Sequence, residues 1–400
     1  MTFADLWAEL LPIGRDAATG GYQRFSWGDA DLAARDWFTG QARVRDLDVH
    51  TDRNGNLWAW WGPPGPDAVV TGSHLDSVPD GGAFDGPLGI VSALAAVDRL
   101  RARGARPVRP VALAVFVEEE GARFGVPCLG SRLLTGAVPA ARARDLRDAD
   151  GVTWAAAMAA AGLDPDAIGA DDALLGQAGA FVELHVEQGR ALVHRDAPVG
   201  VASAIWPHGR WRLDFTGEAN HAGTTQLTDR RDPMLTFANT VLSARKKARL
   251  AGALATIGKV VVEPGATNAI PSAVRAWLDA RAPDEQTLDA TTEEILRAAA
   301  ERAARDGTAV RGTCESYTPA VEFASGLRDR ISGRLGGVPV LPTGAGHDAA
   351  VLAARVPTAM LFVRNPTGVS HAPGEHASLA DCLAGVDALA DVLEDLACQP

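Results

Sequence analysis

The stretch GSHLDSVPDGGAFDGPLGI, residues 72–90, holds one histidine, three aspartates and five glycines. The apolar run AVVT precedes it at residues 68–71, and the Ala-rich segment IVSALAAVDRL follows it at residues 90–100. A short apolar run is typical of a buried strand, and the longer segment is typical of a helix. The pattern therefore places a charged, glycine-rich loop between a strand and a helix, and packing alone does not explain so much charge there.

Strands and helices alternate on both sides of this loop. Strands that are apolar at every position are typical of a sheet covered on both faces. Their alternation with helices predicts an α/β fold with a mixed, mostly parallel sheet and flanking helices. The expected elements are a helix at 32–44, a hairpin at 48–62 with its turn at Asn54-Gly55, a helix at 87–104, and strands at 111–117 and 180–186.

The pattern changes near residue 208. Between residues 210 and 318 the order is strand, helix, strand, strand, helix, strand. This is the order of a ferredoxin-like α+β domain, in which two helices cover one face of an antiparallel sheet. After about residue 322 the apolar α/β pattern returns. We expect an α/β domain built from residues 1–207 and 322–400, with a second domain inserted at residues 208–321.

Composition narrows the class of protein. A chain of 400 residues is longer than one hydrophobic core usually supports, which agrees with two domains. The formal net charge is −12, so nucleic acid and anionic membranes are disfavoured as partners. No apolar run approaches the length of a membrane span, and the N-terminal residues do not resemble a signal peptide. The four cysteines are widely spaced, as in a reduced cytoplasmic protein, which is the location we expect.

Polar clusters follow the predicted apolar strands. Ligands of open α/β sheets gather at the carboxyl ends of the strands. A lone histidine in such a place is more often a hydrogen-bonded core residue, but four clusters at four strand ends favour a metal site. These clusters are His74 and Asp76 with Asp85, the run Glu118 to Glu120, His185 in VELHVEQG, and His371 with Glu375 in GVSHAPGEHAS.

The donor types in these clusters suit a hydrolytic metal pair. Imidazole and carboxylate ligands without thiolates suit Zn²⁺, Mn²⁺, Co²⁺ or Ni²⁺. A two-metal hydrolytic site needs one bridging carboxylate, terminal ligands on each ion and a free general base. The candidates suffice for such a site, with Asp85 as the bridge, His74, His185, Glu120 and His371 as terminal ligands, and Glu119 as the base.

Eight segments together resemble a known family. The chain resembles the M20-type metallo-amidohydrolases, in the branch that contains N-carbamoyl-L-amino acid hydrolases, allantoate amidohydrolases and β-ureidopropionases. The matching segments run from about residue 20 to 395 in the family's order. They are GSHLDSV with GGAFDGPLG, EEEGARF, LGS, ELHVEQG, FTGEANHAGTT with RRDPM, TNAIPS with LDAR, GAGHDA and GVSHAPGEH.

The resemblance implies a role for each residue of the metal site. It implies two divalent ions, Zn²⁺ or Mn²⁺, with Co²⁺ or Ni²⁺ as alternatives. Glu119 would be the general base, and Asp76 would fix the tautomer of the His74 imidazole. Among the ligands, His74 and His185 would bind the first ion, Glu120 and His371 the second, and Asp85 both.

The resemblance also implies that the inserted domain is a lid and the interface of a homodimer. His221 would polarise the substrate carbonyl, Asn268 and Arg281 would hold the substrate carboxylate, and Gln188 would line the pocket. The residues alone leave other roles open, since Asn268 could shape the turn before Pro271 and Arg281 could be a surface residue.

The implied reaction is hydrolysis of a carbamoyl or ureido carbon–nitrogen bond in a small amino-acid-like substrate. Arg364 favours a substrate with a second anionic group, as in allantoate or an N-carbamoyl or N-formyl acidic amino acid. Allantoate is the first expectation, because the segment MLFVRNPTGVSH (360–371) most resembles the sequences of the allantoate amidohydrolases. An N-carbamoyl-L-amino acid, or an N-formyl or N-carbamoyl acidic amino acid, is the alternative. Two other classes stay open: an M20 peptidase or deacylase, and a metal-stabilised binding protein without catalysis.

Overall fold

The computed structural model describes residues 1–398 and divides the chain into two compact units. The first unit contains residues 1–204 and resumes at Glu322, and the second unit is Ile205–Val321. The first crossing lies three residues before the predicted position at 207/208, and the second lies at the predicted 321/322. No helix among the described residues is both long and apolar enough to cross a membrane.

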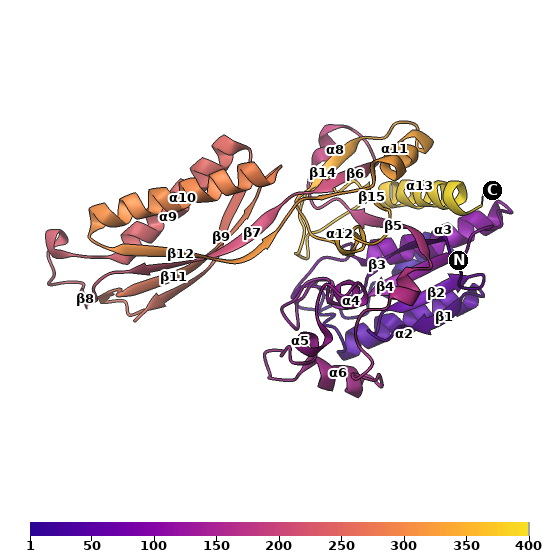
Figure 1. The fold of residues 1–400 in the computed structure, drawn as a ribbon, viewed down its shortest axis with the longest axis horizontal. Coiled ribbons are helices and arrows are strands. Elements are labelled where there is room, and N and C mark those ends of the chain that lie inside the picture. Colours follow the sequence, from indigo (N-terminus) through magenta and orange to yellow (C-terminus); the bar gives the residue numbers. More distant parts are fainter. Residues whose placement is uncertain (399–400) are drawn as a thin grey trace. The chain divides into compact units, whose positions relative to one another are not determined.

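A nine-stranded mixed sheet forms the centre of the first unit (Figure 1). Its main strand order is β1-β2-β4-β3-β5-β15-β6-β13, and β14 pairs with β6. The four inner strands β4, β3, β5 and β15 are parallel to one another, while β1 pairs antiparallel with β2, β2 with β4, and β6 with β15. The strands are β1 (Asp48–Thr51), β2 (Leu57–Trp61), β3 (Ala68–His74), β4 (Val111–Phe116), β5 (Ala178–Val186), β6 (Val199–Ile205), β13 (Val321–Glu322), β14 (Val340–Thr343) and β15 (Thr358–Val363).

The inner strands are buried because helices cover the sheet. Every residue of β3, β4 and β15 is buried, as the continuous apolar runs predict. The predicted α/β fold is thereby confirmed. The helices of this unit are α1 (Phe3–Leu10), α2 (Asp29–Val44), α3 (Pro87–Ala102), α4 (Leu129–Leu134), α5 (Ala140–Arg144), α6 (Trp154–Ala160), α7 (Asp172–Leu175), α8 (Ala191–His194), α11 (Ser325–Arg334), α12 (Asp348–Leu352) and α13 (Leu379–Ala397).

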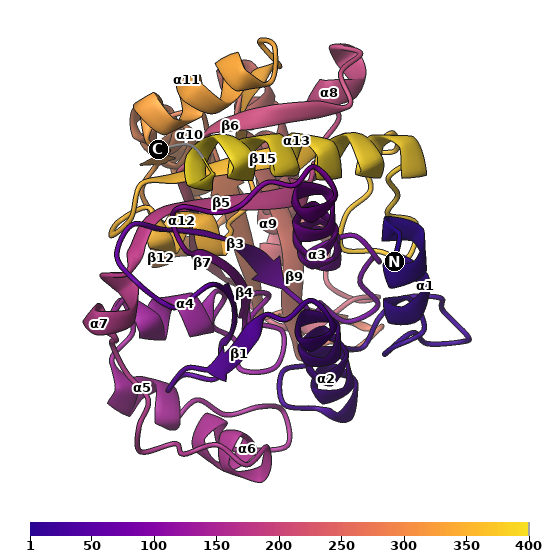
Figure 2. The same ribbon diagram turned by 90° about the vertical axis from the view of Figure 1, so that its right-hand side faces the viewer.

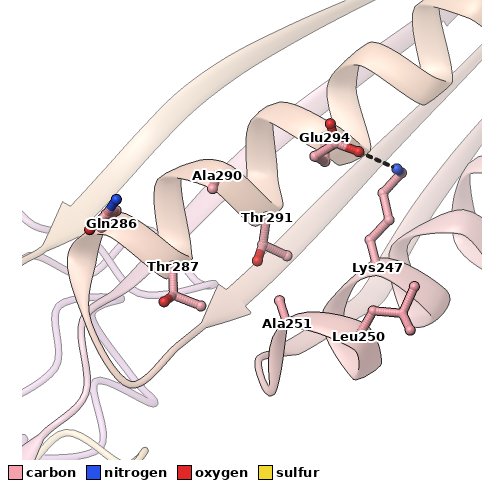
Figure 3. A pocket seen from close by; sticks show the side chains of 8 residues that line it. All are labelled: Lys247, Leu250, Ala251, Gln286, Thr287, Ala290, Thr291 and Glu294. Carbon is pink, nitrogen blue, oxygen red and sulfur yellow. Dashed lines mark hydrogen bonds and ion pairs between the residues drawn. The ribbon is translucent and has the colours of Figure 1, made fainter.

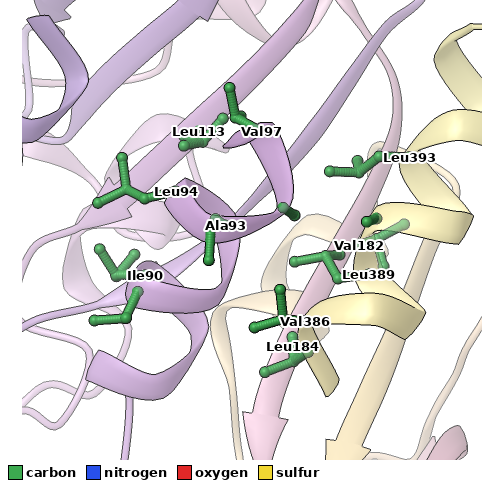
Figure 4. Packing of buried hydrophobic residues seen from close by; sticks show 14 of the residues in the cluster. Ile90, Ala93, Leu94, Val97, Leu113, Val182, Leu184, Val386, Leu389 and Leu393 are labelled. Carbon is green, nitrogen blue, oxygen red and sulfur yellow. The ribbon is translucent and has the colours of Figure 1, made fainter. Parts of the chain in front are cut away.

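The main core lies between the sheet and the helices α3 and α13. These two helices are far apart in the sequence and pack against each other (Figure 2). Their apolar faces meet the side chains of β4 and β5, and Figure 4 shows this contact. The side chains drawn there include Ile90, Ala93, Leu94, Val97, Leu113, Val182, Leu184, Val386, Leu389 and Leu393. This core fixes the parallel strands whose carboxyl ends carry the predicted site residues.

The second unit is a four-stranded antiparallel sheet with two helices on one face (Figure 1). Its strand order is β12-β7-β11-β9, and buried positions alternate along β7 and β11 because only one face packs against α9 and α10. The predicted strand and helix order is observed. The elements are β7 (His208–Thr216), β8 (Asn220–His221), the 3₁₀ helix η1 (Leu227–Asp229), α9 (Pro233–Ala251), β9 (Leu254–Glu263), β10 (Ala269–Ile270), β11 (Ala273–Arg281), α10 (Glu285–Asp306) and β12 (Ala309–Thr318).

Candidate metal centre

One oxygen of Asp85 faces two histidines. His74 is the last residue of β3, and His185 is the next-to-last residue of β5, which pairs with β3. Asp85 Oδ1 lies 3.5 Å from His74 Nε2 and 3.1 Å from His185 Nε2. All three side chains are buried. They form a first group of three ligand atoms within 4.8 Å of one another.

The other oxygen of Asp85 faces a second group. Asp85 Oδ2 lies 3.3 Å from His371 Nε2, which in turn lies 3.5 Å from Glu120 Oε2. His371 follows β15, and Glu120 follows β4, so this group joins two further strand ends. Asp85 thus offers a separate oxygen to each group, which is the arrangement of a bridging carboxylate.

The spacing of these atoms fits a transition-metal ion in each group. Two ligands of a tetrahedral ion with bonds of about 2.1 Å lie about 3.4 Å apart. The observed separations of Asp85 from the three histidines, 3.1 Å to 3.5 Å, agree with that value. His74 Nε2 and His185 Nε2 are buried and have no hydrogen-bond partner in the protein. Buried polar atoms are usually paired, and an ion bound between these side chains would supply the partner that the two nitrogens lack.

The tautomers of both buried histidines are set by backbone carbonyls. His185 Nδ1 donates to the oxygen of Val186 at 2.9 Å, and His74 Nδ1 donates to the main-chain oxygen of Asp76 at 3.1 Å. In the neutral imidazole, each Nε2 would then carry the lone pair that can bind an ion.

Asp76 acts on two parts of the centre. Its Oδ1 lies 3.6 Å from His74 Nδ1, farther than its own main-chain oxygen. Its carboxylate accepts the backbone N–H groups of Glu119 and Glu120 at 3.2 Å and 3.1 Å. The predicted role of Asp76 toward the His74 imidazole thus falls mainly to its backbone, while its side chain holds the loop of the two glutamates.

The electrostatics of the centre are those of a site that lacks positive charge. Burial raises the pKa of Glu120 to about 7, and the negative charge of Asp85 adds to the effect. Burial also raises the pKa of Glu119 well above its usual range, with Asp348 and Glu120 adding to it. The hydrogen bond to Asp85 raises the pKa of His371 to about 9. Burial and the neighbouring negative charges favour the protonated forms of Glu119 and Glu120, and divalent cations would oppose both effects.

Glu119 is close to the first group without belonging to either. Its Oε2 lies 3.7 Å from His74 Nε2, and its Oε1 accepts a hydrogen bond from the buried thiol of Cys128 at 3.5 Å. The neighbouring Glu118 accepts the N–H groups of Arg123 and Phe124 instead. The Glu119 carboxylate thus accepts no backbone N–H group that the structure records, in contrast to that of Glu118. The sequence offered no signal for the contact with Cys128.

Gln188 lies beside the second group. Its Nε2 donates to Asp85 Oδ2 at 2.8 Å and to Ser370 Oγ at 3.1 Å, and lies 3.4 Å from His371 Nε2. The predicted pocket residue therefore touches the bridging carboxylate.

The other three predicted substrate residues lie in the second unit. The main-chain oxygen of Asn268 accepts the N–H of Ala222, so Asn268 and His221 are adjacent. Arg281 ends β11, which begins at Ala273, close to the β8–β10 pair. Eight residue steps of about 3.3 Å therefore put about 26 Å between Arg281 and the other two. Within one copy of this unit, a small substrate cannot contact both ends of that strand.

Arg364 does not have the role expected for it. Its guanidinium binds Asp381, in the first turn of α13, at 2.8 Å, and Asp196 at 3.3 Å. Both contacts are within the first unit and serve its packing. The sequence expectation that Arg364 supplies a second anion site is therefore wrong, because two nearby carboxylates already use its charge.

A third set of possible ligands, Glu183, His185 and His347, shares His185 with the first group. The Nδ1 of His185 is engaged with Val186, so only its Nε2 can bind an ion. This set therefore competes with the first group for the same nitrogen of His185.

A groove of about 500 Å³ lies in the second unit, between α9 and α10 (Figure 3). Lys247 and Glu294 form an ion pair of 2.6 Å across it, and Thr287, Thr291 and Leu250 line it. None of the predicted site residues is part of this groove.

Comparisons with known proteins give the family. The model of peptidase family M20/M25/M40 matches residues 70–395. The chain is 36% identical to an N-carbamoyl-L-amino acid amidohydrolase of Geobacillus stearothermophilus, covering 98% of each chain. It is 32% identical to the allantoate amidohydrolase of Escherichia coli K12, covering 98% of this chain and 96% of that protein.

A solved structure agrees with these relatives. It is an amidase of the hydantoinase/carbamoylase family from Burkholderia multivorans, with a TM-score of 0.88 and 29% identity, covering 100% of this chain and 98% of that one. The resemblance drawn from the eight sequence segments is confirmed by these matches. The chain belongs to peptidase family M20/M25/M40.

Proposed function

We propose that this protein is a di-metal amidohydrolase that cleaves a carbamoyl or ureido carbon–nitrogen bond in a small amino-acid-like substrate. The observation that carries the proposal is the geometry of Asp85, whose two oxygens face separate ligand groups while Glu119 stays outside both. A site that only stabilised the fold would have no need of an additional buried carboxylate beside its ligands.

Two divalent ions, bound by His74, Asp85, His185, Glu120 and His371, would lower the pKa of the attacking water and polarise the substrate carbonyl. Glu119 would take the proton of that water and later give it to the leaving nitrogen. Asp76 keeps the Glu119 backbone in place through its N–H. The thiol of Cys128 donates a hydrogen bond to the same carboxylate, and this bond keeps the Glu119 side chain in one orientation. Zn²⁺ and Mn²⁺ are the proposed ions, with Co²⁺ and Ni²⁺ as alternatives.

The choice of substrate rests on the relatives. Two similar proteins are named allantoate amidohydrolase and N-carbamoyl-L-amino acid amidohydrolase, and both names describe a carbamoyl or ureido substrate. We propose allantoate first and an N-carbamoyl-L-amino acid as the alternative. The ion pairs of Arg364 remove the argument for a second anion site that the sequence offered. Gln188, His221, Asn268 and Arg281 remain the proposed substrate residues, and a cytoplasmic location is part of the same proposal.

We also propose a homodimer formed by the second unit. β9 is one of the two edge strands of its sheet, and the exposed Val260 and Val261 lie on it. α9 packs beside β9 and exposes Leu242 and Leu250, with exposed fractions of 68% and 72%. An unprotected edge strand beside exposed apolar residues favours pairing with the same surface of a second copy. Two copies would also allow one substrate to meet both ends of β11.

The general base is tested by replacing Glu119. We expect Glu119→Gln to lower kcat by about 10²–10⁴-fold while metal content stays at two ions per chain. Glu118→Gln is the matched control, because that carboxylate is bound to the backbone N–H groups of Arg123 and Phe124. Ammonia release and metal analysis are measured on the same samples. Full activity in Glu119→Gln would overturn the assignment.

The substrate is tested by ammonia release from allantoate and from a series of N-carbamoyl-L-amino acids, with Mn²⁺ and Zn²⁺ compared. N-formyl-L-glutamate and a dipeptide are included as the other substrate classes. Turnover of allantoate above the N-carbamoyl compounds supports the first choice. Turnover of the dipeptide alone would place the protein among the peptidases, and no turnover at all would favour a binding protein.

The dimer is tested by light scattering after size-exclusion chromatography. We expect Leu242→Glu to convert two-chain particles into single chains, because it places a charge on the exposed face of α9. Ala300→Glu on the exposed surface of α10 is the control and should leave the dimer intact. Single chains in the unmodified protein would contradict the proposal.

A further inference from the structure

A buried glutamate joins the loop of the bridging aspartate to the loop of His371. Glu375 lies four residues after His371, is 5% exposed, and directs its side chain toward the segment before α3. Its Oε2 accepts the backbone N–H of Phe84 at 2.9 Å and that of Asp85 at 3.0 Å. One carboxylate oxygen thus holds two consecutive amides, one of which belongs to the bridging residue itself.

The loop is built around this carboxylate. At Gly82, a Cβ atom would lie 2.2 Å from Glu375 Oε2 and 2.4 Å from Glu375 Cβ, so no larger residue fits there. The Phe84 ring stacks on Trp7 at 4.7 Å and meets the edge of the His376 ring at 5.9 Å. The segments around Phe84 and Glu375 are therefore attached through backbone amides and through side chains.

The segment that carries Glu375, residues 371–375, has a defined backbone conformation as well. His371 has a left-handed backbone conformation with φ of 55°, and Glu375 N–H donates to the oxygen of Ala372 at 3.0 Å. These features form a tight turn that carries His371 at one end and Glu375 at the other. The turn fixes Glu375 relative to a ligand of the second group, while its carboxylate fixes the backbone of Asp85.

We propose that Glu375 is a positioning residue, whose carboxylate holds the Phe84 and Asp85 amides and so sets the Asp85 carboxylate between the two metal ions. This inference rests on the proposed di-metal function. Removing the hydrogen bonds would leave the Asp85 backbone free to rotate, and the two oxygens would then no longer face their separate groups. Supporting residues of this kind change metal affinity by about 10–100-fold when they are replaced.

Three substitutions separate the hydrogen bonds of Glu375 from its charge. Glu375→Gln keeps an oxygen acceptor at the same distance and removes the charge. Glu375→Asp keeps the charge and withdraws the carboxylate by one methylene. Glu375→Ala removes both. If the hydrogen bonds are what matters, Glu375→Gln stays within about threefold of the unmodified protein in metal affinity, while Glu375→Asp and Glu375→Ala lose tenfold or more.

The measurement is competition for Zn²⁺ and Mn²⁺ against a chromophoric chelator, on the full chain. Gly82→Ala displaces Glu375 without altering its charge and should behave like Glu375→Ala. Asp52→Asn is the matched control, since Asp52 also accepts two backbone N–H groups, those of Asn54 and Asn56, and contacts no metal ligand. It should keep the metal affinity of the unmodified protein even if the melting temperature falls.

Hydrogen exchange of the segment containing Phe84 and Asp85, in chelator-treated protein, gives a readout that needs no ion. Protection should fall in Glu375→Ala and persist in Glu375→Gln. Unchanged affinity and protection in Glu375→Ala, or a loss of affinity in Glu375→Gln greater than in Glu375→Asp, would overturn the inference. Unmodified protein that binds two ions but releases no ammonia would overturn the proposed function alone, and protein that binds no ion would overturn both.

Discussion

Asp85 is the residue on which both ligand groups depend, because each of its oxygens serves a different group. Burial raises the pKa of Asp85, but the three histidines around it outweigh that effect and hold the pKa well below its usual range. The carboxylate therefore stays charged before any ion binds. The terminal ligands differ in this respect, since Glu120 and His371 hold protons near neutral pH.

Metal binding at the second group is expected to tighten as the pH rises. Both ligands must lose a proton before they bind, and their pKa values in the metal-free protein are about 7 for Glu120 and about 9 for His371. The affinity for Mn²⁺ should increase through pH 7 and level off above pH 9. Chelator competition from pH 6 to 9.5 checks this. The Glu120→Gln variant should lose the step near pH 7, and an affinity independent of pH would contradict the prediction.

Arg364 is expected to matter for stability and not for substrate choice. Arg364→Ala leaves the buried carboxylate of Asp381 without its cation, at an expected cost of about 1.5–3 kcal/mol in the free energy of unfolding. Urea unfolding measures the loss. The ratio of kcat/KM for allantoate over N-carbamoyl-L-amino acids should stay unchanged in the folded variant. A change of tenfold in that ratio would return Arg364 to the substrate pocket.

At the scale of elements, the centre depends on how closely α3 approaches the sheet. α3 begins at Pro87, two residues after Asp85. The position of the helix therefore determines the position of the Asp85 backbone, from which the carboxylate extends. Gly89 in its first turn has no room for a side chain. An added Cβ would lie 2.4 Å from the main-chain oxygen of Leu184 and 2.8 Å from the Cβ of Ser73. The helix therefore rests directly on the backbone of β5 and on β3.

Replacing two helical glycines by alanine should give opposite results. Gly89→Ala should lower the free energy of unfolding by about 1–3 kcal/mol, because the new methyl group meets backbone that cannot move aside. Gly40→Ala in α2 should raise it by about 0.5–1 kcal/mol, since nothing lies within 4 Å of its Cβ position and alanine favours the helix. Urea unfolding of both variants tests the pair. Stabilisation by Gly89→Ala would show that α3 can shift away from the sheet.

At the scale of the whole molecule, each unit has a hydrophobic core of its own. The core of the first unit includes residues from α3, α13 and the inner strands, and that of the second includes Leu213, Phe215 and Leu278 under its two helices. All five predicted metal ligands belong to the first unit. Metal ions can therefore stabilise that unit directly.

Metal removal is expected to lower the melting temperature of one unit only. An ion that binds only the folded state, at a free concentration of about 100 times its Kd, adds about 2.7 kcal/mol to the stability of that state. Scanning calorimetry with and without a chelator should move the transition of the first unit and leave that of residues 205–321 in place. Hydrogen exchange assigns each transition to its unit. A shift of the second transition alone would place the ions elsewhere.

The fold could be predicted from the sequence wherever the burial of a strand leaves a regular pattern of apolar residues. Continuous apolar runs predict β3, β4 and β15, because both faces of these strands are buried. Alternating apolar residues predict β7 and β11, because only one face of these strands is buried. The short helices between Leu129 and Leu175 were not predicted. Their small core around Trp154 and Phe124 is assembled from separate turns, which leave no period in the sequence.

The sequence by itself determined which residues could bind metal, because the donors lie at the ends of apolar strands or in the loops that follow them. Only the tertiary structure decided which Asp85 oxygen faces which histidine, that Arg364 is bound by Asp381, and that Glu375 holds amides 290 and 291 residues away. The physical reason is that the period of apolar residues along a segment depends on the burial of that segment alone. Hydrogen bonds between loops that are distant in the sequence depend on how the strands of the whole sheet are aligned with one another.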